Sequence, residues 1–366
     1  MADLALPAAA APRLAFVDAL KAVAAQLIVL HHLAFYGPMS DQALPLLPSL
    51  ISWLSQDARI AVQAFLVIGG FLATQSLAPA GVLLASQPLA LVQRRYLKLV
   101  TPYLAAVLIA IACAAIARAL MAHDSLPGVP TVPQIVAHAL LLQSILGYEG
   151  LSAGVWYIAI DFQLFALLLG MLWLARGIGR RGDRTHVAGA LLVAALALAS
   201  LYHFNRHADW DIWGVYFFGA YALGVLTYWA TNRKQATGWL LLIVVPVVIA
   251  LLLDYRSRIA LALLVAVALG LARRTGLLET WPRARLIAFL GQISYSVFLV
   301  HFPVCLVISG LFSRFAAYDP WMNLIGMIIA WLASVAAGAL FYRFVESQSL
   351  RGFWRGRPAS GFRQKP

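Results

Sequence analysis

Long apolar runs, separated by short polar segments, dominate this chain of 366 residues. A transmembrane helix needs roughly 17–25 mostly apolar residues, and ten runs meet or approach that length. They cover residues 15–36, 59–78, 99–121, 155–175, 187–204, 212–230, 238–254, 257–273, 286–311 and 321–345. The pattern therefore predicts an all-α polytopic membrane protein with about ten transmembrane helices.

A further apolar stretch, residues 132–147, is shorter and contains His138, Gln143 and Ser144. Hydropathy alone leaves open whether it spans the membrane, which would give eleven spans. If it does not span, most of the 27 lysine and arginine residues fall on one side, as the positive-inside rule expects of the cytoplasmic side. We therefore predict ten spans, both termini in the cytoplasm, and 132–147 as a re-entrant or interfacial helix at the outer face.

The predicted cytoplasmic side carries Arg13, Arg94, Arg95, Lys98, Arg176, Arg180, Arg181, Arg184, Arg233, Lys234, Arg273, Arg274, Arg283, Arg285, Arg343, Arg351, Arg355, Arg357, Arg363 and Lys365. The opposite side keeps Arg59, Arg118, Arg206, Arg256, Arg258 and Arg314. We expect a short cytoplasmic tail over residues 1–13, one membrane domain over 14–346 and a basic cytoplasmic tail over 347–366. With no long polar segment between the runs, the chemistry is expected in the membrane or at its edges.

Composition supports the membrane class, because 63% of the residues are hydrophobic and only 11% are charged. The net charge of +13 would suggest nucleic acid in a soluble protein. Here the basic residues lie between apolar runs, so we expect them to contact anionic lipid headgroups and expect no nucleic-acid partner. Cys113 and Cys305 lie inside apolar runs and predict neither a disulfide framework nor a metal site.

The first predicted helix holds the densest group of costly intramembrane polar residues. Lys21 and His32 are eleven residues apart, close to three helical turns, so they share a face and lie ~16 Å apart along the axis. Asp18 is placed to pair with Lys21. A neutral histidine in a dry bundle suits a general base, although His32 could also make only an interhelical hydrogen bond. His31 points about 100° away and is expected to be structural.

A basic cluster stands at the cytoplasmic entry of the third predicted helix: Arg94, Arg95 and Lys98. Such residues can be membrane-interface anchors, which would explain one or two of them. Three cations within five residues also form a phosphate-binding cluster, because arginine offers bidentate donors and lysine a compact charge. The cluster therefore predicts a phosphate-bearing ligand that arrives from the cytoplasm.

Asp161 lies about two turns inside the fourth predicted span, where an unpaired carboxylate is costly. Its expected partner is either His32, which it would orient, or an arginine such as Arg118. Other polar residues are expected to be architectural. Gly69 and Gly70 would allow close helix approach, His301 would bridge carbonyls freed by Pro303, and Glu346 would pair with Arg343 or the basic cluster.

Six segments in this order resemble the motifs of the acyltransferase family 3 membrane proteins. They are residues 18–32, 64–72, 95–98, 156–165, 294–303 and 341–346. Gly69 stands where the family has serine, Lys98 where it has arginine and Asp161 where it has glutamate. The resemblance covers essentially the whole membrane region and implies acyl-CoA as donor, a cytoplasmic thioester site, and His32 as the catalytic residue that serves an acceptor on the outer face.

We therefore interpret the chain as an O-acyltransferase of the bacterial inner membrane, moving an acyl group, in expectation acetyl from acetyl-CoA, to a hydroxyl of a cell-envelope or exported carbohydrate. Lys21, Arg94, Arg95 and Lys98 would hold the CoA phosphates, His32 would act as base or transient acyl carrier, and Asp161 would orient it. The alternative is a transporter or flippase of a lipid-linked glycan, which would also need many helices and buried charges. Such folds often show inverted repeats or paired broken helices, and this sequence shows neither.

Overall fold

A computed structural model describes residues 13–179, 185–231, 238–316 and 318–349, and within these ranges the chain is helical without strands. The predicted basic residues Arg180, Arg181, Arg184, Arg233 and Lys234, and most of both predicted tails, lie outside the described residues. The α-helices are α1 (Ala15–Phe35), α2 (Pro38–Ala43), α3 (Pro48–Gln56), α4 (Val62–Leu77), α5 (Pro88–Leu120), α6 (Val132–Ala139), α7 (Val155–Gly179), α8 (Thr185–Tyr202), α9 (Gly214–Ala230), α10 (Gly238–Leu253), α11 (Ser257–Thr275), α12 (Leu277–Thr280), α13 (Arg285–Phe315) and α14 (Pro320–Phe341). The 3₁₀ helices are η1 (Ala58–Ala61), η2 (Phe204–Arg206) and η3 (Ala208–Trp210), and a π-helical turn, η4 (Tyr342–Glu346), follows α14.

The prediction of an all-α polytopic membrane protein is confirmed. Among the described residues, seven helices are long and apolar enough to cross a membrane: α1, α4 with η1, α5, α7, α8, α13 and α14. The other three predicted runs also form helices, but α9 and α10 have only 17 and 16 residues and α11 carries three arginines. The predicted number of about ten is therefore approximate, since helices near the lower limit of ~17 residues cannot be counted by length alone.

The segment 132–147 contains only the eight-residue helix α6, which is closed at its start by a capping box between Thr131 and Gln134. At ~1.5 Å per residue, eight residues reach about 12 Å, well short of the ~30 Å hydrocarbon core. His138 then ties the segment to its own loop: its Nδ1 lies 2.8 Å from the Gln134 carbonyl and its Nε2 accepts from the Leu151 N–H at 3.1 Å. By length, this segment does not span, as predicted.

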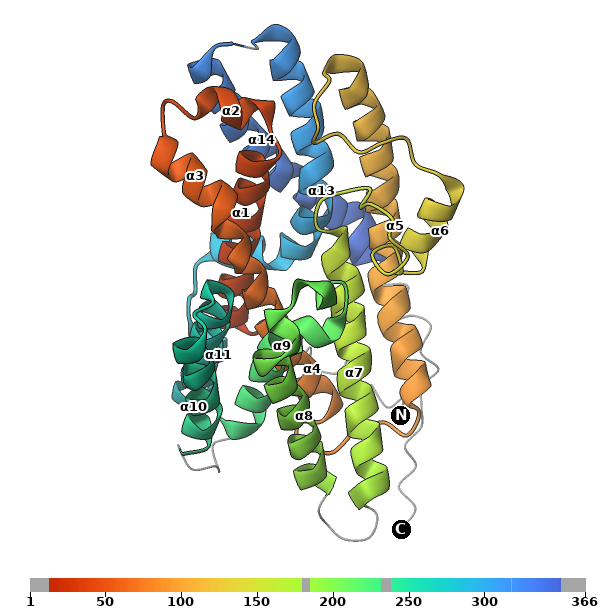
Figure 1. Cartoon of the computed structure of the whole chain (residues 1–366), viewed down its shortest axis with the longest axis vertical. Coiled ribbons are helices and arrows are strands. Elements are labelled where there is room, and N and C mark those ends of the chain that lie inside the picture. The colour runs from red at the N-terminus through yellow and green to blue at the C-terminus, as the bar shows by residue number, and fades with distance from the viewer. Residues whose placement is uncertain (1–12, 180–184, 232–237, 317, 350–366) are drawn as a thin grey trace, which may run out of the picture.

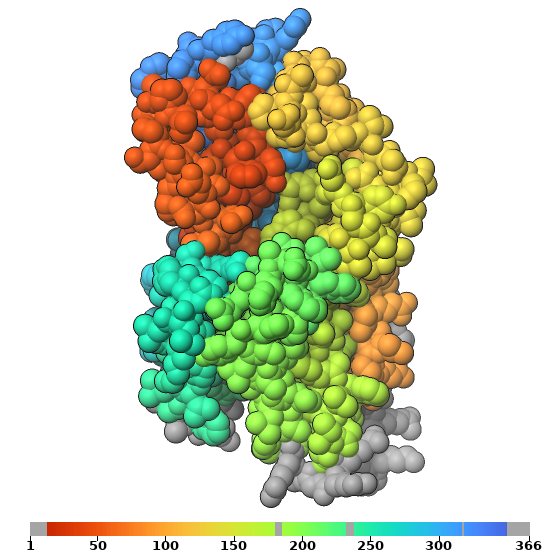
Figure 2. Space-filling model, in the orientation of Figure 1, coloured from red at the N-terminus to blue at the C-terminus, as the bar shows by residue number. Residues whose placement is uncertain are grey.

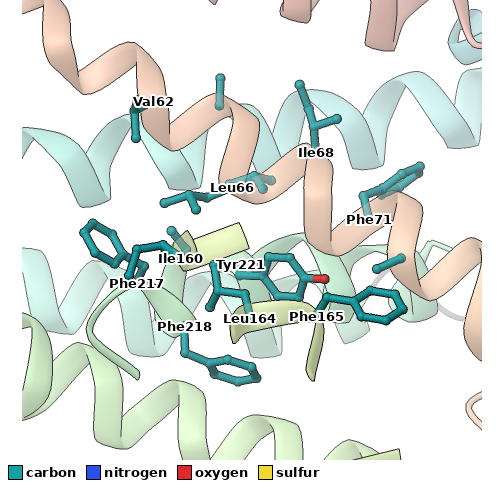
Figure 3. Close-up of a cluster of buried hydrophobic side chains, with 14 of the residues drawn as sticks. Val62, Leu66, Ile68, Phe71, Ile160, Leu164, Phe165, Phe217, Phe218 and Tyr221 are labelled. Carbon is teal, nitrogen blue, oxygen red and sulfur yellow. The ribbon is translucent and has the colours of Figure 1, made fainter. Parts of the chain in front are cut away.

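Glycines let α4 and α9 approach at backbone distance. A Cβ at Gly70 would stand 2.0 Å from the Tyr221 carbonyl oxygen, and one at Gly224 would stand 1.9 Å from that of Val67. The predicted close approach at Gly70 is thus confirmed, and its partner is α9. Figure 3 shows the apolar cluster beside this contact, formed by Val62, Leu66, Ile68, Phe71, Ile160, Leu164, Phe165, Phe217, Phe218 and Tyr221.

Helix α13 packs against α1, α5 and α14 (Figure 1). Gly291 of α13 lies where a Cβ would be 2.3 Å from the Asp18 carbonyl oxygen of α1, and Gly338 of α14 packs as tightly on Val297. Because α1 and α13 run side by side, polar residues spaced along α1 face polar residues spaced along α13. This pair of helices carries the candidate site.

The loops gather into two opposite groups. The end of α7 meets the α4–α5 loop, where Arg176 donates to the Ala85 carbonyl at 2.6 Å, and we call this side, on which α1 begins, the near face. On the other side, the far face, Arg206 pairs with Asp254 at 3.3 Å and Arg256 donates to Asn205 at 2.8 Å. Successive long helices therefore run in alternating directions between the two faces.

Candidate functional site

A cavity of about 470 Å³, which we call the basic cavity, lies among α1, α4, α5, α7, α13 and η4. Its lining includes the cations Lys21, Arg95 and Lys98, the carboxylates Asp161 and Glu346, and the aromatic residues Phe65, Tyr157, Tyr295 and Phe298. Three of the predicted ligand-binding cations thus meet in one place, although they come from two helices far apart in the sequence.

Arg95 and Asp161 form a largely buried ion pair at the basic cavity. The Arg95 Nη2 lies 2.5 Å from the Asp161 Oδ2, and the guanidinium also stands 5.3 Å from the ring centre of Phe165. The expected hydrogen bond between Asp161 and His32 is therefore wrong. Asp161 faces α5 from α7, whereas His32 faces α13 from α1 and lines a different cavity.

The Arg95 Nε is buried without a hydrogen-bond partner among the described residues, although its Nη2 is satisfied by Asp161. A buried N–H donor left unpaired costs free energy unless a ligand or a water accepts from it. Because this donor belongs to a residue that lines the basic cavity, it is suited to an anionic or carbonyl ligand there.

Lys21 pairs with Asp18 as predicted, with Nζ 3.2 Å from Oδ1, and Arg13 approaches the other carboxylate oxygen at 2.5 Å.

Glu346 does not form the ion pair that the sequence predicted. It lines the basic cavity with Lys21 and Lys98, but its Oε2 accepts from the Ser296 hydroxyl at 2.6 Å, and no ion pair within 4.0 Å joins it to a described residue. The expected ion pair of Glu346 is therefore not formed.

Arg94 is the predicted ligand residue that the structure does not bring into the basic cavity. It is exposed, and it does not line the cavity that its neighbour Arg95 enters. Consecutive helical residues point about 100° apart, so Arg94 diverges from Arg95 and lies on the side of Lys98 away from the cavity. The geometry of Arg94 is that of an interface anchor. Arg118, the suggested partner of Asp161, instead donates to the Pro127 carbonyl at 2.7 Å.

A second cavity, of about 780 Å³, lies toward the far face, and we call it the histidine cavity. Its lining includes His31, His32, Tyr36, Asp57, Arg59, Gln63, Trp156, Asp211, Tyr216, Arg256 and Arg258. In Figure 2 the surface is hollowed between the orange segment that ends near residue 60 and the yellow-green segment near residue 150.

His32 lines the histidine cavity and contacts His301, which is fully buried and does not line the cavity. The His32 Nδ1 lies 2.6 Å from the His301 Nε2, and the two ring planes differ by only 6°. His301 was expected to be architectural, so its place beside His32 was missed. The signal available in the sequence was a second histidine inside an apolar run. His31 points away, as expected, with Nδ1 2.9 Å from the Leu54 carbonyl oxygen.

An aromatic partition separates the two cavities, consisting of Phe65, Tyr157 and Phe298. Phe298 lines both cavities and its ring centre lies 5.4 Å from that of Tyr157 and 6.3 Å from that of Phe65. Gly154 supports it from behind: this residue has φ +83°, and a Cβ there would stand 2.8 Å from the Phe298 ring. Among the side chains that the structure describes, Phe298 is the one common to the linings of the two cavities.

Comparison with known proteins gives one family. A family model described as an acyltransferase domain matches residues 14–343. No curated protein and no solved structure matches the chain. In the part of the chain that the structure describes, no three histidine, cysteine, aspartate or glutamate side chains are grouped so that they could hold a metal ion.

Proposed function

The chain belongs to the acyltransferase 3 family and is a membrane acyltransferase, and from this premise we propose that it moves the acyl group of an acyl-CoA, foremost acetyl, to a carbohydrate hydroxyl. The observation that carries the proposal is the pair of cavities on either side of Phe298. One holds Lys21, Arg95 and Lys98, and the other holds His32, which can move a proton, together with three arginines and two aspartates.

The donor is assigned to the basic cavity. CoA carries several phosphate charges, and Lys21, Lys98 and the unpaired Arg95 Nε offer charge-assisted donors to them or to the carbonyl groups of the pantetheine arm. The aromatic side chains of the cavity offer apolar contact to the rest of that arm. Because acyl-CoA is a cytoplasmic metabolite, the near face is the cytoplasmic one in this proposal, in the inner membrane of a bacterium.

The acceptor is assigned to the histidine cavity. Trp156 and Tyr216 offer aromatic faces, and Gln63, Asp57 and Asp211 offer hydrogen-bonding groups, a combination suited to a sugar. The far face would then be the outer face of the membrane, where a cell-envelope or exported carbohydrate is reached. Membrane lipids surround the exposed apolar side chains between the two faces.

The reaction follows from this placement. His32 accepts the proton of the acceptor hydroxyl while the hydroxyl oxygen attacks the thioester carbonyl carbon. The new carbon–oxygen bond forms as the carbon–sulfur bond breaks, and the leaving thiolate takes the proton from the His32 imidazolium, which restores neutral His32 and yields CoA with a free thiol. Asp161 acts by holding Arg95 and has no part in the proton transfer.

The proposal is tested with the full chain purified in lipid nanodiscs, with radiolabelled acetyl-CoA and a panel of soluble oligosaccharides. Label in an oligosaccharide together with an equal amount of free CoA thiol supports it. A chain that is stabilised against heating by CoA, yet labels no carbohydrate, would overturn the acceptor class. In a parallel assay with the chain in sealed proteoliposomes, movement of an unmodified glycan across the bilayer without release of CoA would overturn the reaction and favour a flippase.

A further inference from the structure

The hydrogen bonds of His301 determine where its proton lies. Its Nδ1 stands 3.0 Å from the carbonyl oxygen of Val297, four residues earlier on α13. A carbonyl only accepts, so the Nδ1 of His301 carries the hydrogen. The Nε2 of His301 is therefore the atom that decides the role of His32.

Burial favours the neutral form of His301. The ring is 0% exposed, and no described carboxylate lies within 4.0 Å of it or of His32. A protonated His301 would be an uncompensated charge in this interior, which is costly. Neutral His301 with its hydrogen on Nδ1 has a lone pair on Nε2, and this lone pair accepts the N–H of the His32 Nδ1, 2.6 Å away.

It follows that neutral His32 carries its hydrogen on Nδ1 and its lone pair on Nε2. In the part of the chain that the structure describes, no group hydrogen-bonds to this Nε2, and His32 lines the histidine cavity. We propose that His301 is a positioning residue that holds His32 in the one tautomer whose Nε2 can act as a base toward the cavity. The role as base rests on the proposed function, whereas the tautomer stands without it.

The device resembles the role of aspartate in a Ser-His-Asp triad, with a difference. In both, a partner accepts the N–H of the base and fixes its tautomer and ring orientation. Here the partner is a neutral imidazole held by a backbone carbonyl, which needs no buried carboxylate. The sequence led us to expect Asp161 as the residue that orients His32, but Asp161 forms an ion pair with Arg95 instead.

The first test compares two variants, His301→Gln and His301→Leu. The glutamine side-chain oxygen can still accept the His32 N–H, whereas leucine cannot. We expect His301→Leu to lower kcat on the order of 100-fold with an unchanged KM for acyl-CoA, and His301→Gln to keep kcat within about tenfold of the wild type. The control is His138→Gln at a buried histidine outside both cavities, which should leave kcat unchanged. Equal losses in both His301 variants, or no loss in His301→Leu, would overturn the positioning role.

The second test uses the unmodified chain and reads no acyl transfer. Diethylpyrocarbonate acylates an unprotonated imidazole nitrogen, and peptide mass spectrometry locates the adduct. We expect the adduct on His32 and not on His301, because both nitrogens of His301 are hydrogen-bonded. An adduct on His301 at the rate of His32 or faster, or none on His32, would overturn the assigned tautomer. If the wild type transfers no acyl group but shows the expected adduct, the proposed function fails while the tautomer holds.

Discussion

Both cavities carry cations and carboxylates, and they differ in the pair of side chains that each one centres on. The basic cavity brings three cations and two carboxylates together and joins one arginine to an aspartate. At the histidine cavity, the lining residue His32 lies against the fully buried His301, without a described carboxylate within ion-pair distance of either. The first is equipped to hold a charged molecule in place, and the second to move a proton.

This difference has an electrostatic reason. A carboxylate beside His32 would stabilise the imidazolium, so a larger share of the histidine would already be protonated at neutral pH and unable to accept a proton. A neutral partner orients the ring without that cost. Asp161 therefore serves better in the basic cavity, where Arg95 compensates its charge, and Phe298 keeps the two environments apart.

The largest expected effect is the loss of the base. His32→Ala should lower acyl transfer by at least about 1,000-fold, because it removes the proposed general base, the imidazole that the His301 contact orients toward the cavity. Binding of acyl-CoA should survive, since His32 does not line the basic cavity. The measurements are label transfer and the thermal shift produced by CoA. A variant that still transfers label at wild-type rate would remove this mechanism, and one that loses the CoA shift would show that the cavities are not separate.

The next effect concerns the ion pair of the basic cavity. Replacing Asp161 by alanine leaves Arg95 charged and largely buried without its partner, and breaking such a pair costs about 3 kcal/mol of stability. The double variant Arg95→Met, Asp161→Leu should recover most of the loss in thermal unfolding of the detergent-solubilised protein. Additive losses in the double variant would mean that the two side chains are not energetically coupled.

A smaller effect is expected at the partition. Phe298→Ala should open the passage between the cavities, so that butyryl-CoA gains about tenfold in kcat/KM relative to acetyl-CoA, the scale of a few methylene groups in an apolar pocket. The matched control is Phe302→Ala, a buried phenylalanine on the same helix that packs on Tyr36. Identical chain-length preference in both variants would show that Phe298 does not limit the acyl group.

Periodicity and charge predicted the helical membrane class, the ten apolar runs and the short segment near 132–147, because burial in lipid constrains every residue of a span. Lys21 and His32 lie on one uninterrupted helix, α1, as predicted; Lys21 lines the basic cavity and His32 contacts His301 of α13. These properties are local to one helix. What joins different helices was not predictable from one sequence.

The partner choices of Asp161 and His32 show why. Both residues were expected to have partners, since an unpaired polar side chain inside the membrane costs free energy. The sequence gives only the depth of each residue along its span, and depth does not tell which side of α1 or α7 faces which neighbouring helix. The approach of Gly291 to α1 places α13, and with it His301, beside His32. Arg95 reaches Asp161 from α5 for the same kind of reason.

The smallest expected effect separates two cations that the sequence grouped together. Lys98 lines the basic cavity and Arg94, four residues earlier, does not. We expect Lys98→Gln to raise the KM for acyl-CoA several-fold with kcat unchanged, because it removes binding that is equal in the ground and transition states. Arg94→Gln should leave both constants within about twofold, since exposed charges far from a ligand are screened. The measurement is the dependence of initial rate on acyl-CoA concentration in nanodiscs of fixed lipid composition. If Arg94→Gln raised the KM as much as Lys98→Gln, the phosphates would be bound at the membrane surface and not in the cavity, and the division of labour between the two cavities would begin outside the helix bundle.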